Sequence, residues 1–452
     1  MNFFNTVPSL VFSFFASVFL FSVFCGFLWR VCLCDMQVHS HAFVRRYLFR
    51  IGGVILLLYG GYLAVAWSSV SPEVYFYNYV DQFHFWEKCE ELAQYPSIGR
   101  IFEDCFVRRI HIEQEAIYFW FGTLGCIANK FLGGNNVYFQ MYWVSFFAVL
   151  LNITVARLAL LFTDSKTAFK WTLIFAGCSF LLGYSPWLLR DVHIAFLFTF
   201  GLLLLFRGGT LWGIGLQFII VIVLYQLRYE SCFLYLPILG YYVWFWGRGA
   251  SSRVIIRVCA VLGGMCAFAG SIGFLISFLE TILSTGTLYN EWTAEMASEG
   301  GLARYIYMLP PGIRHFFVVV YSQMTPFPFW TTLWACRTPS QFILEGVNAI
   351  SPIVWPYIAF FTAYRVCSLQ RLKSSPVIVK FLIVYSALFL IANSSNIHFR
   401  RLLCVTPIIF LLFLYFRERS SPSERSRFLG MFSFCYLCGC VLYVLLKGGI
   451  LL

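Results

Sequence analysis

Long apolar runs alternate with short polar segments along most of the chain. About 20 consecutive apolar residues cross a bilayer as a helix, whereas a barrel strand would alternate over about ten. The pattern therefore predicts the all-α class, a polytopic integral membrane protein in which residues 1–452 form one membrane domain with about 12 transmembrane helices. The expected spans are 8–29, 51–70, 137–162, 171–187, 194–206, 211–227, 232–246, 258–278, 342–363, 377–392, 402–415 and 430–446.

Two further apolar stretches, residues 116–132 and 316–334, do not fit a simple crossing. The second contains two prolines within three residues, which do not suit a straight helix. A crossing by the first would reverse the side of every later loop and place the basic loop 248–257 outside, against the positive-inside rule. We therefore expect both stretches to be interfacial or re-entrant parts of two larger external loops, 71–136 and 280–341.

Composition and charge favour a membrane protein over a nucleic-acid-binding protein. Hydrophobic residues make up 60% of the chain and charged residues only 12%, against about 25% charged residues in soluble domains. Basic residues in cytoplasmic loops such as 30–50 explain the net charge of +12, so no nucleic acid is expected as a partner. Segment 71–115 instead carries nine acidic and four basic residues, a net charge of −5. This asymmetry places the segment, and both chain ends, outside in the expected topology.

The 16 cysteines lie mostly inside apolar runs, where they act as small hydrophobic residues. Cys435 and Cys438 have the spacing of a zinc pair, but their span offers no other ligands, so no metal or cofactor is expected. Cys89 and Cys105 lie in the first external loop, where a disulfide is reasonable if the loop faces an oxidising compartment.

Three charged junctions interrupt the apolar sequence: 190–193 (Arg-Asp-Val-His), 228–230 (Arg-Tyr-Glu) and 398–401 (His-Phe-Arg-Arg). The loop charges place all three on the outer face, together with Arg314. Charges at the ends of membrane spans are tolerated only if they reach water or a partner. The junctions are therefore the strongest candidates for a functional site.

Structural alternatives exist for the same charged residues. An arginine at the end of a span is often a snorkelling anchor, although Arg190 and Arg228 oppose the positive-inside preference. Asp191 and Glu230 have the alternative role of first-turn charges that stabilise the following helix. For His193, one turn from Arg190, a structural and a catalytic role both stay open.

The residue types at these junctions suit binding of a phosphorylated sugar. The guanidinium fork matches phosphate oxygens and keeps its charge, and a nearby imidazole or carboxylate can act as a general base. The outer loops also combine acidic and aromatic residues, which suit sugar binding because aromatic faces stack on pyranose rings and carboxylates accept hydrogen bonds from hydroxyl groups. The binding candidates are Arg190, Arg228, Arg314, Arg400, Arg401, Asp81 and Glu115. The candidates for the catalytic base are Asp191, His193, Glu230 and His398.

Short motifs follow one another in a recognisable order within residues 30–245. They are a basic inner loop, Tyr77-Asn78-Tyr79-Val80-Asp81, an acid-led stretch from Glu115 to Asn136, Arg190-Asp191, and Arg228-Tyr229-Glu230-Ser231 before Leu236-Pro237. In these motifs the chain resembles the O-antigen and exopolysaccharide polymerases (Wzy-type, EpsG-like), a family of polytopic membrane proteins. It departs from them at Asp191, where the group often has glutamine, and it lacks a proline after Glu115.

The resemblance implies a multi-pass polymerase of the bacterial inner (cytoplasmic) membrane whose active face is periplasmic. Such an enzyme joins undecaprenyl-pyrophosphate-linked oligosaccharide repeats by glycosyl transfer without a metal, among membrane lipids and with a chain-length regulator protein as a candidate partner. Arg190, Arg228 and Arg400 or Arg401 would hold the donor pyrophosphate.

Two alternatives remain open at this stage. A GT-C type glycosyltransferase that adds one lipid-linked sugar would use an acid such as Asp81, often with a divalent metal. A polysaccharide flippase or transporter usually carries polar residues within its spans and inverted repeats, and neither feature is evident here.

Overall fold

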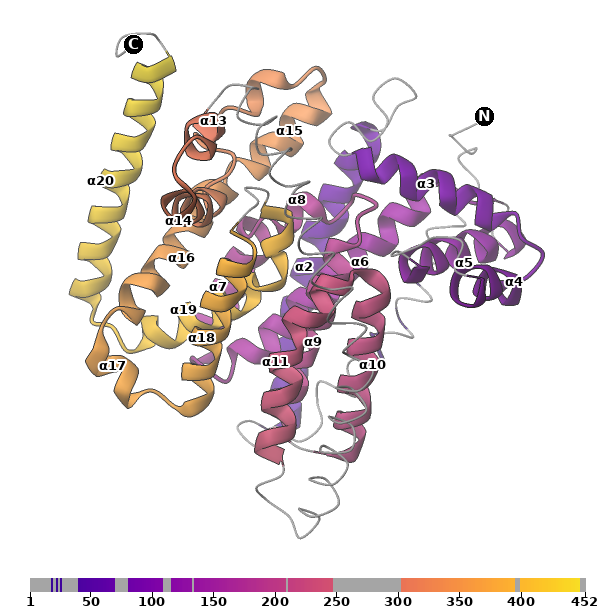
Figure 1. Cartoon of the computed structure of the whole chain (residues 1–452), viewed down its shortest axis with the longest axis horizontal. Helices are drawn as coiled ribbons and strands as arrows, with labels where there is room; N and C mark the ends of the chain where they lie inside the picture. The colour runs from indigo at the N-terminus through magenta and orange to yellow at the C-terminus, as the bar shows by residue number, and fades with distance from the viewer. Residues whose placement is uncertain are drawn as a thin grey trace.

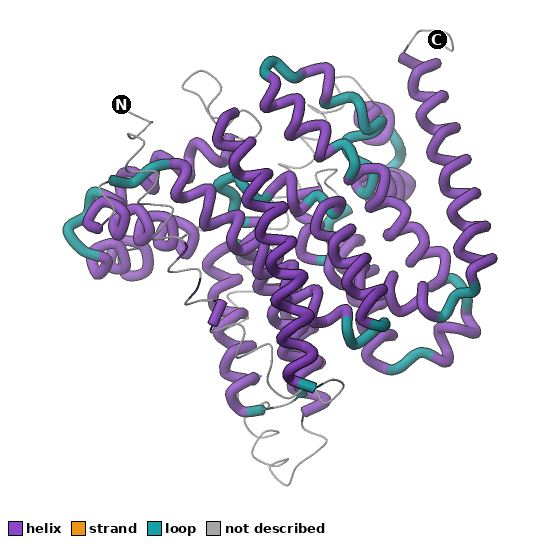
Figure 2. The backbone as a smooth tube through the Cα atoms, turned by 180° about the vertical axis from the view of Figure 1, so that it is seen from behind, coloured by secondary structure: helices purple, strands orange, loops and turns teal. Residues whose placement is uncertain are grey.

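The computed structural model describes residues 18, 22, 25, 26, 40–69, 80–108, 115–131, 134–208, 210–246, 302–394 and 399–447. Every regular element within these ranges is a helix, which confirms the all-α class (Figure 2). The expected span 258–278, nearly all of span 8–29 and the candidate base His398 lie outside the described residues.

The helices are labelled in Figure 1. The first half of the chain forms α2 (His41–Ser69), α3 (Val80–Ala93), α4 (Ile98–Phe102), the π-helix η1 (Glu103–Val107), α5 (Glu115–Phe131), α6 (Val137–Ala159), α7 (Ser165–Cys178), α8 (Leu181–Tyr184), α9 (Asp191–Arg207), α10 (Leu211–Leu227) and α11 (Tyr229–Trp246). The second half forms α13 (Leu302–Tyr307), α14 (Pro311–Ser322), the 3-10 helix η2 (Leu333–Ala335), α15 (Pro339–Asn348), α16 (Ser351–Val366), α17 (Leu369–Ser374), α18 (Val377–Ala392), the 3-10 helix η3 (Phe399–Cys404), α19 (Thr406–Glu418) and α20 (Pro422–Lys447).

Helix α6 forms the centre of the bundle, because its sequence is apolar on all sides and must be covered on all sides. It packs against α2, α7, α9 and α19. Helix α20 lies at one edge of the molecule in Figure 1, and only 11% of its apolar window is buried, against 83% for α6. Within the ranges given above, four segments are long and apolar enough to cross a membrane: His41–Ser68, Val137–Ala159, Pro339–Val366 and Pro422–Leu445.

Three expected spans contain a helix boundary in the structure, and the boundary within 402–415 lies between η3 and α19. The helix expected over 171–187 ends at Cys178, because Phe180 adopts a φ of 63°, a left-handed conformation that a right-handed helix cannot contain. This turn places the ring of Phe180 4.1 Å, between centroids, from the ring of Phe399. Within 342–363 the boundary lies between α15 and α16, where Ala349 and Ile350 keep right-handed conformations, so Pro339–Val366 is still one segment long enough to cross a membrane.

The remaining helix boundaries agree with the expected ones in some places and differ in others. Helix α2 begins at His41, so Arg45, Arg46 and Arg50, expected in a loop, lie on its first turns. Helix α14 ends at Ser322, ahead of both prolines of stretch 316–334, as their spacing predicts. Helix α5 packs mainly against α3, and the two lie with α4 at the side of the bundle (Figure 1).

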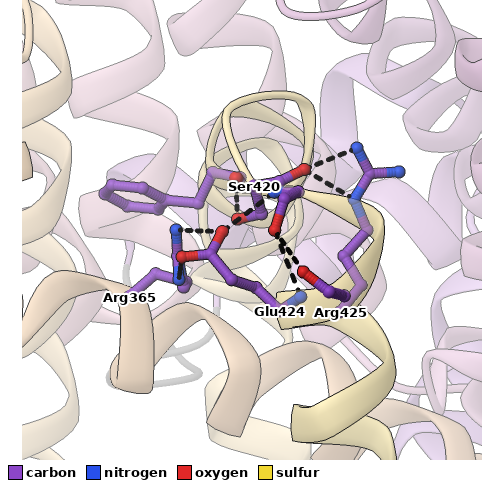
Figure 3. A network of polar contacts seen from close by, with 7 residues as sticks. Arg365, Ser420, Glu424 and Arg425 are labelled. Atoms are coloured by element: carbon purple, nitrogen blue, oxygen red, sulfur yellow. Dashed lines mark hydrogen bonds and ion pairs between the residues drawn. The ribbon is translucent and has the colours of Figure 1, made fainter.

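One end of the bundle is organised by the buried residue Arg365 at the end of α16. Its guanidinium forms a bidentate pair with Glu424 at 3.2 and 3.3 Å (Figure 3). Glu424 also accepts from the backbone N–H of Ser421, whose hydroxyl accepts from the N–H of Glu424, so the pair caps the start of α20. Arg425 donates twice to the carbonyl oxygen of Ser420. These contacts attach an otherwise little-buried helix to the bundle.

Three helices meet closely at Gly201 in α9. The amide of Gln217 in α10 donates to the carbonyl oxygen of Gly201 at 3.0 Å, and the hydroxyl of Tyr235 in α11 donates to Gln217. A Cβ at position 201 would lie 1.8 Å from the hydroxyl oxygen of Tyr235, which is fully buried. Only glycine therefore permits this packing of α9, α10 and α11.

Replacing Gly201 by alanine is expected to destabilise the protein by about 1–3 kcal/mol, because the added methyl group overpacks this contact. The measurement is thermal unfolding of the purified protein in detergent. Gly215→Ala in α10 is the matched control, since open space surrounds that position and alanine is the better helix former. Equal melting temperatures for the two variants would contradict the packing described here.

Candidate functional site

The three charged junctions of the sequence meet at the start of α9. Asp191 Oδ1 lies 2.7 Å from Arg228 Nη2, and Asp191 Oδ2 lies 3.3 Å from Arg400 Nε. Arg400 also reaches Asp81 at the start of α3, with 2.7 Å between Nη1 and Oδ2. Alternating charges thus connect four side chains, which we call the Asp191 cluster (Asp81, Asp191, Arg228 and Arg400).

Local backbone geometry explains why Arg228 can reach Asp191. Helix α10 ends at Leu227, and Arg228 adopts an extended conformation with φ −167° and ψ 112°. Its N–H still donates to Leu224 and its carbonyl oxygen accepts from Ser231, so a single residue links α10 to α11. The carboxylate of Asp191 lies in the first turn of α9, where the helix dipole also favours negative charge.

The contacts of the cluster differ in burial and therefore in strength. The side chains of Asp191 and Arg228 are 2% and 8% exposed, whereas the side chain of Asp81 is 50% exposed. Removing one partner of a buried pair costs about 3–5 kcal/mol, but an exposed pair contributes only about 0.2–1 kcal/mol. The Asp191–Arg228 contact is therefore structural, and the Asp81–Arg400 contact is weak.

Asp191 is ionised within this cluster. Burial opposes ionisation, but Arg228, Arg400 and Arg190 outweigh it and lower the pKa of the Asp191 carboxyl below its ordinary value. Burial likewise opposes the charge of Arg400, while Asp191 and Asp81 raise the pKa of its guanidinium overall. A carboxylate held by two arginines is a poor proton acceptor, so Asp191 is better suited to positioning the arginines than to base catalysis.

Arg190 differs from the two arginines of the cluster. Its Nη1 donates to the carbonyl oxygen of Leu227 at 2.9 Å, and among the described residues no carboxylate lies within ion-pair distance of it. Burial and then the charge of Arg228 lower the pKa of Arg190 to about 10, so it is protonated at neutral pH. Arg190 therefore supplies a positive charge beside a cluster whose charges are paired, and only one of its guanidinium nitrogens is engaged in a hydrogen bond with a described residue.

Glu230 is the acidic residue next to this cation. It lies half-buried in the first turn of α11 and interacts electrostatically with Arg190 and Arg228. Within the described part of the chain it has no ion-pair partner. Of the candidate bases that the structure describes, Glu230 is thus the one with an accessible and unpaired acceptor.

His193 lies in an aromatic environment and not in the Asp191 cluster. Its ring centroid is 4.5 Å from that of Phe147, 6.0 Å from that of Phe121 and 6.5 Å from that of Trp120. Nδ1 lies 3.3 Å from the carbonyl oxygen of Leu189, and the buried Nε2 has no hydrogen-bond partner. With 5% exposure, this imidazole is not accessible to a substrate hydroxyl, so the geometry favours its structural role.

The other predicted residues are placed elsewhere. Arg314 lies in the first turn of α14, Glu115 is buried at the start of α5, and Arg401 follows Arg400 in η3. None of the three takes part in the ion pairs of the Asp191 cluster. Beside Arg314, His315 Nδ1 lies 3.2 Å from the carbonyl oxygen of Ser394, a contact that the sequence pattern does not predict.

Among the described residues, the cysteines and potential metal ligands add no second site. Cys89 and Cys105 are both buried free thiols, and Cys89 donates to the carbonyl oxygen of Phe121, so the disulfide considered for this pair is not formed. In the described ranges, no three His, Cys, Asp or Glu side chains are grouped as a metal ion would require.

Comparison with family models, with curated proteins and with solved structures finds no match for this chain. The geometry of the Asp191 cluster and its neighbours Arg190 and Glu230 therefore carries the functional argument alone.

Proposed function

We propose that the chain is a polysaccharide polymerase of the bacterial inner membrane. It would join oligosaccharide repeats carried on undecaprenyl pyrophosphate, at the periplasmic face, with a chain-length regulator as a candidate partner protein. The observation that carries the proposal is the cationic site at Arg190, which has unused donors beside the paired arginines of the Asp191 cluster. A pyrophosphate is the anion that such a group of guanidinium forks suits best.

The chemistry follows from these positions. The acceptor hydroxyl oxygen attacks the anomeric carbon of the donor sugar and transfers its proton to the carboxylate of Glu230. The bond from the anomeric carbon to the pyrophosphate oxygen breaks, and the electron pair leaves on that oxygen. Arg190, supported by Arg228 and Arg400, stabilises the charge that develops on the leaving group. Asp191 orients Arg228 and Arg400 and does not exchange a proton.

Glu230→Gln is expected to slow glycosyl transfer by about 10²–10⁴-fold, the usual contribution of a general base. Binding of undecaprenyl pyrophosphate should be retained, because Arg190 is unchanged. The measurement compares single-turnover rates and lipid binding for the purified variant. If Glu230 is only a first-turn charge of α11, the variant keeps its transfer rate and loses about 0.3–1 kcal/mol of stability. A normal transfer rate would therefore exclude Glu230 as the base.

A further inference from the structure

We propose that Asp81 occupies the position of a substrate phosphate on Arg400, and that the second phosphate of a lipid pyrophosphate displaces it. This inference rests on the proposed function and deepens it. It changes the role of Asp81 from a residue that holds the substrate to an internal competitor of the substrate. It also assigns the site a preference for pyrophosphate over monophosphate.

The geometry around Arg400 is that of an arginine shared by two carboxylates. Nε faces Asp191 Oδ2 at 3.3 Å, and Nη1 faces Asp81 Oδ2 at 2.7 Å. Asp81 comes from a helix 319 residues away in sequence. Its contact with Arg400 is the one pair of the cluster in which a carboxylate is half exposed to solvent.

The difference in burial decides which carboxylate can leave. Asp191 is 2% exposed and is also held by Arg228, so it cannot move away from Arg400 without disturbing a buried ion pair. The carboxylate of Asp81 is 50% exposed and regains hydration when it is released. An incoming anion therefore competes with Asp81 and leaves the Asp191–Arg228 pair intact.

Release of Asp81 also makes the net charge of the site more favourable for an anionic ligand. With Asp81 in place, Arg190, Arg228 and Arg400 face the three carboxylates of Asp81, Asp191 and Glu230. When Asp81 leaves, one positive charge remains in excess.

A phosphate oxygen accepts the same guanidinium hydrogen bonds as a carboxylate. Arg190 can hold one phosphate without any exchange, whereas a second phosphate needs the Nη1 donor that Asp81 occupies. Arg190 immediately precedes Asp191, the residue whose carboxylate contacts Arg400 at 3.3 Å.

The test measures binding to the full-length protein in lipid nanodiscs. The probes are undecaprenyl pyrophosphate, undecaprenyl monophosphate and inorganic pyrophosphate. Asp81→Asn should bind undecaprenyl pyrophosphate about two- to fivefold more tightly than the wild type, the range expected from loss of one exposed competing ion pair. Its affinity for the monophosphate should not change. In the double variant Asp81→Asn/Arg400→Ala the gain should disappear.

Glu87→Gln is the matched control, because Glu87 is an exposed acid on the same helix and makes no contact with Arg400. An equal gain in Glu87→Gln would show a general charge effect and overturn the proposal. Unchanged or weaker pyrophosphate binding by Asp81→Asn would overturn it as well. A gain for inorganic pyrophosphate without one for the lipid would reject a lipid ligand.

Arg190→Ala separates this inference from the proposed function. If Arg190→Ala binds undecaprenyl pyrophosphate as the wild type does, the proposed function fails. If Arg190→Ala loses binding while Asp81→Asn shows no gain, only the role of Asp81 fails.

Discussion

Arg190→Ala is expected to abolish polymer formation and to leave single repeats on their lipid carrier. The substitution removes the cation that has no carboxylate partner among the described residues, so the pyrophosphate loses its main contact. Loss of one charge-stabilising donor typically costs about 10²–10³-fold in rate. The measurement is gel analysis of surface polysaccharide, together with mass analysis of lipid-linked oligosaccharide, in cells that carry only the variant.

Two further variants control this prediction. Arg207→Ala removes an arginine from the opposite end of α9 and should leave the polymer unchanged. Arg190→Lys keeps the charge and loses the fork, so it should give shorter or less abundant polymer. A normal polymer ladder from Arg190→Ala would contradict the assignment of Arg190 to the substrate.

Arg228→Ala is expected to destabilise the protein by about 3–5 kcal/mol, because Asp191 would remain buried and lose its closest partner. The variant should unfold at a much lower temperature in detergent, or fail to accumulate in the membrane. The effect is mainly one of stability, in contrast to Arg190→Ala, which removes one hydrogen bond and, within the described residues, no ion pair and should therefore unfold closer to the wild type.

Removing both partners of the buried pair provides the control for Arg228. In Asp191→Leu/Arg228→Met no uncompensated charge remains, so much of the stability should return even though activity is lost. If Arg228→Ala unfolds at the same temperature as the wild type, the pair does not have the structural role proposed for it.

The hydrophobic pattern predicted those helices whose ends coincide with a change in polarity. The runs 211–227 and 377–392 match α10 and α18 to the residue. The pattern failed where a backbone conformation ends a helix inside an apolar run, as at Phe180. Tertiary packing decides that turn, since Phe180 rests on Phe399, and hydropathy carries no information about it.

The site was predictable only in part, because the charge pattern is visible in the sequence and the side-chain orientations are not. Loop charges placed the junctions of Asp191, Arg228 and Arg400 on one face, and the structure brings these three side chains into contact. Sequence spacing could not show which way a side chain turns at the start of a helix. By sequence alone His193 is therefore a candidate equivalent to Asp191, whereas its ring lies among aromatic side chains. The acceptor for Arg190 is a backbone carbonyl oxygen, at Leu227, which no residue type reveals.

The central claim is that this chain transfers lipid-linked oligosaccharide repeats onto one another. The most direct measurement reconstitutes the purified protein with lipid-linked oligosaccharide from cells that lack it, and follows the products by mass analysis. We expect a ladder of products that differ by one repeat, with undecaprenyl pyrophosphate released at each step, and no ladder with Arg190→Ala. Addition of a single sugar, or translocation of intact repeats without any new glycosidic bond, would contradict the claim.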